Sequence, residues 1–297
     1  MHYTGNIFRP PFEARSLLLQ VTTGCSHNRC TFCTMYRETP FRMESLEQIE
    51  EDLMEAAALA PNTRRVFLEN GDPFVLPAER LAAIARMIRE KLPKVETIAM
   101  YASIKNIRSK TDAELKTLWE FGINDLNIGV ESGYDPAHRY MNKDHTTEEA
   151  IRELCRLKAV GMDFGLNLIL GCAGSGNGEA NAVATAELVN RTQPNLIFTG
   201  TMHSDPGCPL YEDMRSGAFA ENTVAEYLDE TELLVSRLEL ERCRYFALHP
   251  SNIVRTDAML PEGKAALLQE IRMTRRYTSA ETLASRPRRF GEGAVLL

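Results

Sequence analysis

Short apolar runs alternate along the chain with longer segments whose apolar residues recur at helical spacing. The runs are rich in leucine, isoleucine and valine, which is typical of strands buried on both faces of a sheet. Six runs are predicted to be strands, at residues 16–22, 65–68, 97–101, 125–130, 164–170 and 195–199. A helical pattern follows each of them, so the chain repeats a strand-then-helix unit.

Signals at the predicted helix starts support this division. Three starts carry a capping box, in which a Ser or Thr and a Glu or Gln three residues later exchange hydrogen bonds with the backbone. The pairs are Ser45 with Gln48, Thr111 with Glu114, and Thr146 with Glu149. The helix after the second strand places four apolar residues on one face, which we expect to be buried: Leu81, Ile84, Ala85 and Ile88.

Six strand-then-helix units in succession indicate a parallel sheet with right-handed crossovers. The pattern alone allows a doubly wound sheet, a full barrel or a partial barrel. In each of these folds the ligand site lies at the carboxyl ends of the strands, so the residues just after each strand are the functional candidates. A softer boundary near residues 207–220 precedes a predicted helix at 223–238, a strand at 242–248 and a helix from 261.

Composition and charge narrow the class of protein. The 297 residues are 44% hydrophobic and 25% charged, which excludes a disordered or fibrous chain. A formal net charge of −7 gives the chain no excess of basic residues, so a nucleic-acid partner is disfavoured. No apolar run approaches the roughly 18 residues of a membrane span, and residues 1–15 lack the apolar core of a signal peptide. We therefore expect a cytoplasmic protein with no membrane partner.

The cysteines are the most informative residues. There are seven, an odd number, and Cys25, Cys30 and Cys33 lie together directly after the first predicted strand. This is a poor disulfide framework and a good pattern for ligands of a soft metal. Structural zinc needs four ligands, and iron–sulfur clusters usually take four cysteines. Three thiolates therefore leave one coordination position open, unless His27 closes it as in a structural zinc site.

The cysteine loop resembles the signature of the radical S-adenosylmethionine (radical SAM) superfamily. The common spacing there is C-x3-C-x2-C, with an aromatic residue before the last cysteine. Phe32 matches the aromatic and Cys30-x2-Cys33 matches the second half, whereas the first gap has four residues here, which we interpret as a lengthened loop. The resemblance implies a [4Fe–4S] cluster held by Cys25, Cys30 and Cys33, an open iron for S-adenosyl-L-methionine (SAM), and an α/β fold, a partial (β/α)6 TIM-type barrel with a short α/β C-terminal extension.

The residues after the second strand are similar to the Gly-Gly-Glu-Pro stretch of that superfamily. Asn70, Gly71 and Asp72 occupy this place, with Asp72 where the family commonly has glutamate. In the family the stretch holds the methionyl ammonium of SAM, which needs carbonyl and carboxylate acceptors. The alternative for these residues is an ordinary turn after a strand.

The fourth and fifth strands carry further matches. Glu131 and Ser132, followed by Lys143, look like the stretch shared by coproporphyrinogen-dehydrogenase, methylthiotransferase and elongator-type members. By resemblance, Glu131 hydrogen-bonds SAM and Lys143 meets its carboxylate; without it, Lys143 would be a solvated surface lysine. The fifth strand is similar to the family's adenine-binding strand, which implies that Asn167 contacts the ribose.

The other four cysteines divide into two pairs. Cys155 is predicted to pack on the apolar face of a helix, and Cys243 to pack beside a late strand. Cys172 and Cys208 each follow a strand, so they are candidate hydrogen-atom donors to a substrate radical, as in some epimerases of the superfamily. A small buried hydrophobic residue is the alternative for each.

We interpret the chain as a radical SAM enzyme with a core barrel at residues 1–209 and an extension at 210–297. The resemblance implies reductive cleavage of SAM to a 5′-deoxyadenosyl radical, an oxygen-sensitive reaction that needs an external electron donor such as flavodoxin or ferredoxin. We expect a small-molecule or peptide substrate. Two alternatives are a zinc-stabilised binding module, and a SAM-binding iron–sulfur scaffold or electron carrier without radical catalysis.

Overall fold

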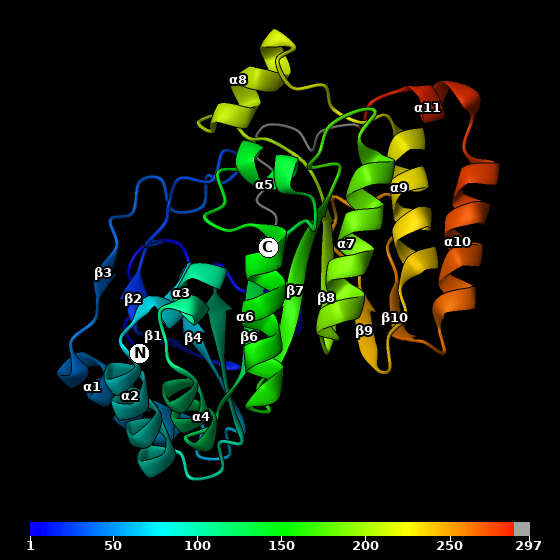
Figure 1. Cartoon of the computed structure of the whole chain (residues 1–297). Coiled ribbons are helices and arrows are strands. Elements are labelled where there is room, and N and C mark those ends of the chain that lie inside the picture. Colours follow the sequence, from blue (N-terminus) through cyan, green and yellow to red (C-terminus); the bar gives the residue numbers. More distant parts are fainter. Residues whose placement is uncertain (288–297) are drawn as a thin grey trace. The chain divides into compact units, whose positions relative to one another are not determined.

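The computed structural model describes residues 1–287 (Figure 1). The chain divides into two compact units. The first unit consists of Met1–Arg29, Met35–Gly129 and Arg152–Gly165, and the second consists of Cys30–Thr34, Val130–Ile151 and residues 166–287. The division passes through the cysteine loop, so Cys25 belongs to the first unit and Cys30 and Cys33 belong to the second.

The main sheet has eight strands in the order β1-β4-β5-β6-β7-β8-β9-β10. Their bounds are Leu17–Gln20, Arg65–Glu69, Thr97–Ala102, Ile123–Glu131, Asp163–Leu170, Leu196–Thr201, Cys243–Phe246 and Asp257–Leu260. The pairs β1–β4, β4–β5, β5–β6 and β8–β9 are parallel, and β9–β10 is antiparallel. The predicted class is confirmed: an α/β fold of the partial TIM-barrel type, continued by a short α/β extension. A separate small sheet pairs β2 (Thr22–Thr23) with β3 (Arg42–Met43).

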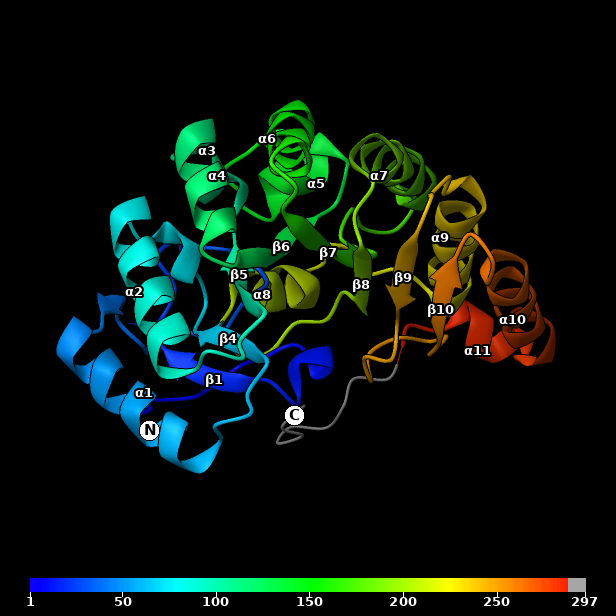
Figure 2. The ribbon, with the colours of Figure 1, turned by 90° about the horizontal axis from the view of Figure 1, so that it is seen from below.

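Three long helices of the first unit lie along its strands: α1 (Leu46–Leu59), α2 (Ala78–Lys91) and α4 (Asp112–Glu120). Helix α2 packs between α1 and α4 (Figure 2). Its predicted apolar face is completely buried, at Leu81, Ile84, Ala85 and Ile88. The strand residues beneath, such as Phe67 and Ala99, are also fully buried, as the continuous apolar runs predicted.

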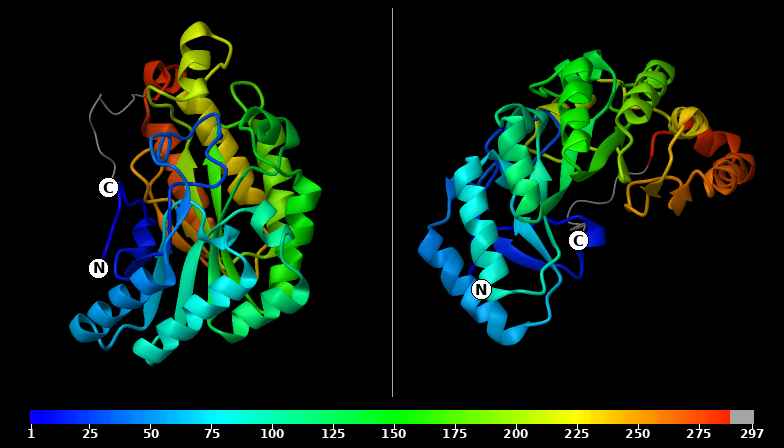
Figure 3. Two further views of the ribbon diagram at one scale, coloured as in Figure 1. Left: turned by 90° about the vertical axis from the view of Figure 1, so that its left-hand side faces the viewer. Right: turned by 60° about the horizontal axis from the view of Figure 1, so that its bottom comes forward.

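The second unit is built around a row of helices (Figure 2 and Figure 3). Helix α7 (Gly178–Thr192) packs against α9 (Val224–Arg237), and α9 packs against α10 (Lys264–Tyr277) and α11 (Ala280–Ala284). Helix α6 (Thr147–Ala159) begins in the second unit and ends in the first. The expected boundary between residues 209 and 210 stays a prediction.

The helix starts follow the predicted capping chemistry. Thr111 and Glu114 form a complete capping box at α4. Thr146 and Glu149 exchange the same two bonds before α6. At α1 the Ser45 hydroxyl accepts from the backbone N–H of Gln48.

Several short elements were not predicted. They are the 3-10 turns η1 (Pro11–Glu13) and η2 (Pro73–Val75), and the helices α3 (Ile104–Arg108), α5 (Asp135–Tyr140) and α8 (Pro209–Ser216). These segments are too short to show helical periodicity, and β10 is defined only through its pairing with β9. In residues 1–287 no helix is both long and apolar enough to cross a membrane.

Candidate functional site

In the first unit, the turn after β4 lies against the start of the cysteine loop. The N–H of Gly71 donates to the carbonyl of Gly24 at 3.0 Å, and the N–H of Gly24 donates to Asn70 Oδ1 at 3.2 Å. A side-chain carbon added to Gly71 would lie 2.8 Å from Cys25 Cβ and 2.8 Å from the Tyr36 ring. The turn therefore needs glycine here, and it brings the predicted cofactor residues Asn70 and Gly71 beside Cys25.

Two buried polar atoms at this turn have no hydrogen-bond partner among residues 1–287, Glu69 Oε1 and Asn70 Nδ2. Both residues are completely buried, and Glu69 Oε2 accepts from the Asn70 N–H at 3.0 Å. Burial raises the pKa of Glu69 to about 7, against the opposing effects of that hydrogen bond and of the charge of Arg9. Because buried polar groups are normally paired, an unused acceptor and an unused donor at a strand end are what a ligand site provides.

Asp72, also predicted to contact SAM, is held by the protein itself. Its Oδ2 accepts a hydrogen bond from the Ser26 hydroxyl, and its Oδ1 accepts one from the Asn106 side-chain amide. Lys110 lies nearby, with its ammonium donating to the carbonyl of Phe74 at 2.6 Å; burial lowers the pKa of Lys110 to about 8. Asp72 thus connects the cysteine loop to α3.

In the second unit, the predicted residues Glu131 and Lys143 form an ion pair. The Lys143 ammonium donates to Glu131 Oε1 at 3.1 Å, and both side chains are 11% exposed. Burial alone would lower the pKa of Lys143, but the charges of Glu131 and Cys30 outweigh it, so the pKa is raised and the lysine is charged. The structure therefore makes Lys143 a buried cation within electrostatic reach of the cysteine loop.

Ser132, another predicted contact, is fully buried and fixed on three sides. Its hydroxyl donates to Asn181 Oδ1 at 2.5 Å and accepts from the Tyr134 N–H at 2.8 Å. Its carbonyl accepts from His138 Nε2 at 2.6 Å, since a carbonyl oxygen cannot donate. Burial, together with the neighbouring His145, lowers the pKa of His138 to about 4, so this ring is neutral at pH 7.

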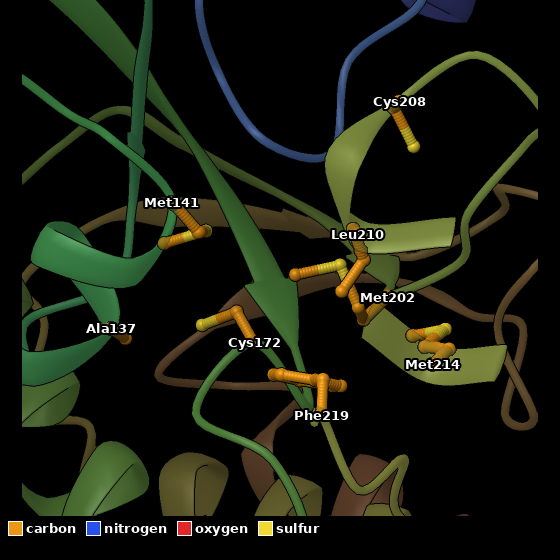
Figure 4. Close-up of a cluster of buried hydrophobic side chains, with 8 residues drawn as sticks. All are labelled: Ala137, Met141, Cys172, Met202, Cys208, Leu210, Met214 and Phe219. Carbon is orange, nitrogen blue, oxygen red and sulfur yellow. The ribbon is translucent and has the colours of Figure 1, made fainter. Parts of the chain in front are cut away.

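The second half of the cysteine loop is held by backbone hydrogen bonds. The N–H of Thr31 donates to the carbonyl of Met141 at 3.2 Å, and the N–H of Leu210 donates to the carbonyl of Thr31 at 3.0 Å. Phe32 packs against a buried, sulfur-rich cluster (Figure 4). Its members are Ala137, Met141, Cys172, Met202, Cys208, Leu210, Met214 and Phe219. Within residues 1–287, no three His, Cys, Asp or Glu side chains are gathered as a ready-made metal site.

A comparison with known protein families identifies the family of this chain. The family model described as "Radical SAM superfamily" matches residues 19–188, more than half of the chain, and this range includes the cysteine loop, the turn after β4 and the Glu131–Lys143 pair. The chain belongs to the radical SAM superfamily.

Curated relatives agree with the predicted group. The radical SAM chain is 24% identical over 155 residues to the heme chaperone HemW of Bacillus subtilis (strain 168), covering 50% of this chain and 41% of that protein. It is 26% identical over 262 residues to tRNA-2-methylthio-N(6)-dimethylallyladenosine synthase of Maricaulis maris (strain MCS10), covering 84% of this chain and 55% of that protein. The chain thus spans about half the length of these relatives.

A solved structure shares the fold. Coproporphyrinogen III oxidase (HemN) from Escherichia coli, described as a radical SAM enzyme, superposes with a TM-score of 0.55 at 16% identity. The match covers 75% of this chain and 52% of that one. At this identity the likeness concerns the fold alone.

The remaining cysteines of this radical SAM protein differ in environment. Cys172 is completely buried, and its thiol lies 3.9 Å from Asn181 Oδ1 and 4.0 Å from the carbonyl of Glu131. Cys208 is 3% exposed. Burial of both agrees with packing, and their role as hydrogen donors stays a prediction. Cys243 is buried as expected, but Cys155 is exposed, so its predicted core position was wrong: on α6 it lies outside the buried stripe formed by its neighbour Leu154 and by Ile151.

Two residues of the second unit were missed by sequence reasoning. Glu230 on α9 is a buried carboxylate bonded to Asn181 on α7, and Asn181 in turn holds Ser132. A signal existed for Glu230, since it falls among the apolar residues Tyr227 and Leu234 on the buried face of its helix. Asn167, predicted to meet the ribose, is half-buried on β7 and on the same strand face as Ile169, which packs against the sulfur-rich cluster.

Proposed function

We propose that this chain is a radical SAM enzyme in which Cys25, Cys30 and Cys33 hold a [4Fe–4S] cluster. The observation that carries the proposal is the loop with three cysteines that follows β2, within the family match. Three thiolates leave one iron free to bind SAM. The bound cluster would supply the electron that cleaves SAM to methionine and a 5′-deoxyadenosyl radical, which abstracts hydrogen from substrate.

The turn after β4 has the chemistry to receive part of SAM. The methionyl group carries an ammonium and a carboxylate, which need an acceptor and a donor, and Glu69 Oε1 and Asn70 Nδ2 are a buried acceptor and donor without partners in residues 1–287. Gly71 has no side chain, which lets the backbone of this turn lie against Cys25 and Tyr36. Asp72 is the third proposed contact, because each of its oxygens accepts one hydrogen bond, from Ser26 or from Asn106, and keeps a lone pair for the ammonium.

The second unit contributes a cation and several packing and hydrogen-bonding residues to the proposed SAM site. We propose that Lys143 receives the SAM carboxylate, with Glu131 keeping the lysine charged and oriented until SAM arrives. Ser132 shapes the site through its hydrogen bond to Asn181. Phe32 shapes it by packing against the sulfur-rich cluster. Asn167 is assigned to the ribose.

Substrate and partners follow from chemistry rather than from the relatives. One relative is named for a tRNA product, but the net charge of −7 favours a small molecule or a peptide. Reductive cleavage of SAM also requires an external one-electron donor of the flavodoxin or ferredoxin class. Cytoplasmic location fits this reducing chemistry.

Anaerobic reconstitution with iron and sulfide tests the proposal. We expect about four irons per chain and a broad brown absorbance. With SAM and a strong reductant, the reconstituted protein should release 5′-deoxyadenosine. Stoichiometric zinc without iron uptake would instead support a zinc-stabilised binding module, and cluster loading without any 5′-deoxyadenosine would support a scaffold or electron carrier.

A further inference from the structure

Glu230 lies on α9, beyond the end of the family match at residue 188. Glu230 is 2% exposed, and its carboxylate accepts hydrogen bonds from three residues. Gly171 N–H donates to it at 3.0 Å, Asn181 Nδ2 at 2.7 Å and Asn222 Nδ2 at 3.1 Å. One side chain of the C-terminal region therefore holds both the end of β7 and the helix α7.

Helix α7 in turn holds the loop after β6 through hydrogen bonds. The Asn181 side chain that donates to Glu230 accepts from the Ser132 hydroxyl at 2.5 Å through its other atom. One residue further, the N–H of Gly133 donates to Thr185 Oγ1 at 2.8 Å, and a side chain on Gly133 would lie 2.3 Å from a backbone oxygen of α7. The loop is thus fixed to α7 by two adjacent residues.

The residue next to this anchor is Glu131, whose backbone is strained. Its φ is +70°, in the left-handed region that a glutamate rarely adopts. Such a conformation persists only where the surroundings impose it. Ser132, which is held by Asn181, is the covalent neighbour of Glu131, and Glu131 Oε1 accepts from the Lys143 ammonium at 3.1 Å.

We infer that Glu230 is a positioning residue for the SAM site, acting through Asn181 and Ser132 on the Glu131–Lys143 pair. The inference rests on the proposed function, because it assigns SAM to that pair. The C-terminal region then contributes to cofactor binding from outside the family-matched segment.

The hydrogen bonds that Glu230 accepts can be tested separately from its charge. Methionine at position 230 keeps the length of the side chain but offers no acceptor to the three donors. Glutamine keeps one oxygen for Gly171 and Asn181, which both reach Oε1, and Asn222 can turn its amide to accept from the new NH2 group. Positioning therefore predicts that glutamine substitutes for Glu230 and methionine does not.

The experiment measures SAM binding by anaerobic equilibrium dialysis with labelled SAM on the reconstituted full chain, without reductant. Glu230→Met should weaken SAM binding about tenfold, the lower range for losing a group that orients a ligand-binding residue, while iron content stays unchanged. Glu230→Gln should bind within about threefold of the wild type. Asn181→Leu breaks the same chain of hydrogen bonds from Glu230 to Ser132. Combining it with Glu230→Met should therefore add little further loss of SAM affinity.

Glu226→Gln is the matched control, because Glu226 is on the same helix but bonds the turn at Ser175 and Gly176 and not Asn181. It should lower the thermal midpoint while leaving SAM affinity unchanged. Equal SAM affinity in Glu230→Met and wild type, or additive effects of Glu230→Met and Asn181→Leu, would overturn the inference. If Glu230→Met does not fold, Asn181→Leu alone decides it. Failure of the wild type to bind SAM would count against the proposed function instead.

Discussion

The Lys143 ammonium lies 3.1 Å from Glu131 Oε1 in an ion pair from which water is largely excluded. The two residues flank the loop and short helix α5 that follow β6. Because each charge is buried, each depends on the other for compensation. A SAM carboxylate reaching Lys143 would meet a cation that is already desolvated and oriented, which lowers the cost of binding.

Replacing Lys143 by methionine should therefore affect SAM binding and stability together. We expect SAM affinity to fall at least tenfold, and the free energy of unfolding to fall by about 3–5 kcal/mol, because Glu131 is left buried and uncompensated. Iron content after reconstitution should not change. Lys116→Met, at an exposed position of α4, is the control and should change neither quantity. Unchanged SAM affinity in Lys143→Met would remove the lysine from the site.

The cysteines allow a test of ligand identity. Cys30→Ala should abolish retention of the cluster, as should the same change at Cys25 or Cys33, since each thiolate holds one iron. Cys155→Ala should retain it, because Cys155 is exposed on α6 and packs in no core. Iron and sulfide analysis after anaerobic gel filtration measures the outcome. Comparable iron loss in the Cys155 variant would mean that the ligands are misassigned.

Gly71 should tolerate no side chain. Alanine there would place a carbon 2.8 Å from Cys25 Cβ and from the Tyr36 ring, and such overpacking typically costs about 1–3 kcal/mol. Because the clash falls on Cys25, cluster retention should fall as well. Gly200→Ala on β8 is the control, since its nearest neighbour would be 3.8 Å away. Full iron content and unchanged stability in Gly71→Ala would show that the turn is not packed against the cysteine loop.

The strands and long helices could be predicted from sequence because their signals are local. A run such as Val66–Leu68 is apolar at every position. The capping box of Thr111 and Glu114 marks the start of helix α4. The short helices α5 and α8 have no such signal, since they are held by bonds to distant residues, as when Leu210 donates to Thr31.

The same distinction applies to the candidate site. Sequence predicted Glu131 and Lys143 separately, through a resemblance, but not that they bond each other. It gave no reason to connect Glu230 with Asn181 and Ser132, which lie far apart in the chain and meet only through the packing of α9 on α7. Cys155 was misplaced for the opposite reason, because its neighbour Leu154 lies on the apolar face while Cys155 itself faces outward.

The charge state of Glu230 gives a prediction for stability against pH. Burial raises its pKa to about 7 in spite of the hydrogen bonds from Gly171, Asn181 and Asn222, whereas an unfolded glutamate titrates near 4.5. The folded protein therefore binds the proton more tightly than the unfolded chain, and stability falls as the pH rises from 4.5 to about 7. Glu230→Gln cannot titrate, so it should lose this slope.

Urea unfolding of both proteins at several pH values measures the effect. The stability of Glu230→Gln relative to wild type should rise between about pH 5 and pH 8, by on the order of 3 kcal/mol at most. Glu226→Gln is the control, because the pKa of Glu226 is shifted in the opposite direction to that of Glu230. Burial would raise the pKa of Glu226, but hydrogen bonds from Ser175, Thr223 and Gly176 outweigh it and lower the pKa to about 2. Its stabilisation is lost only as the pH falls below about 4.5, so above pH 5 the Glu226→Gln difference should be constant. Parallel curves for wild type and Glu230→Gln would show that Glu230 stays ionised across this range.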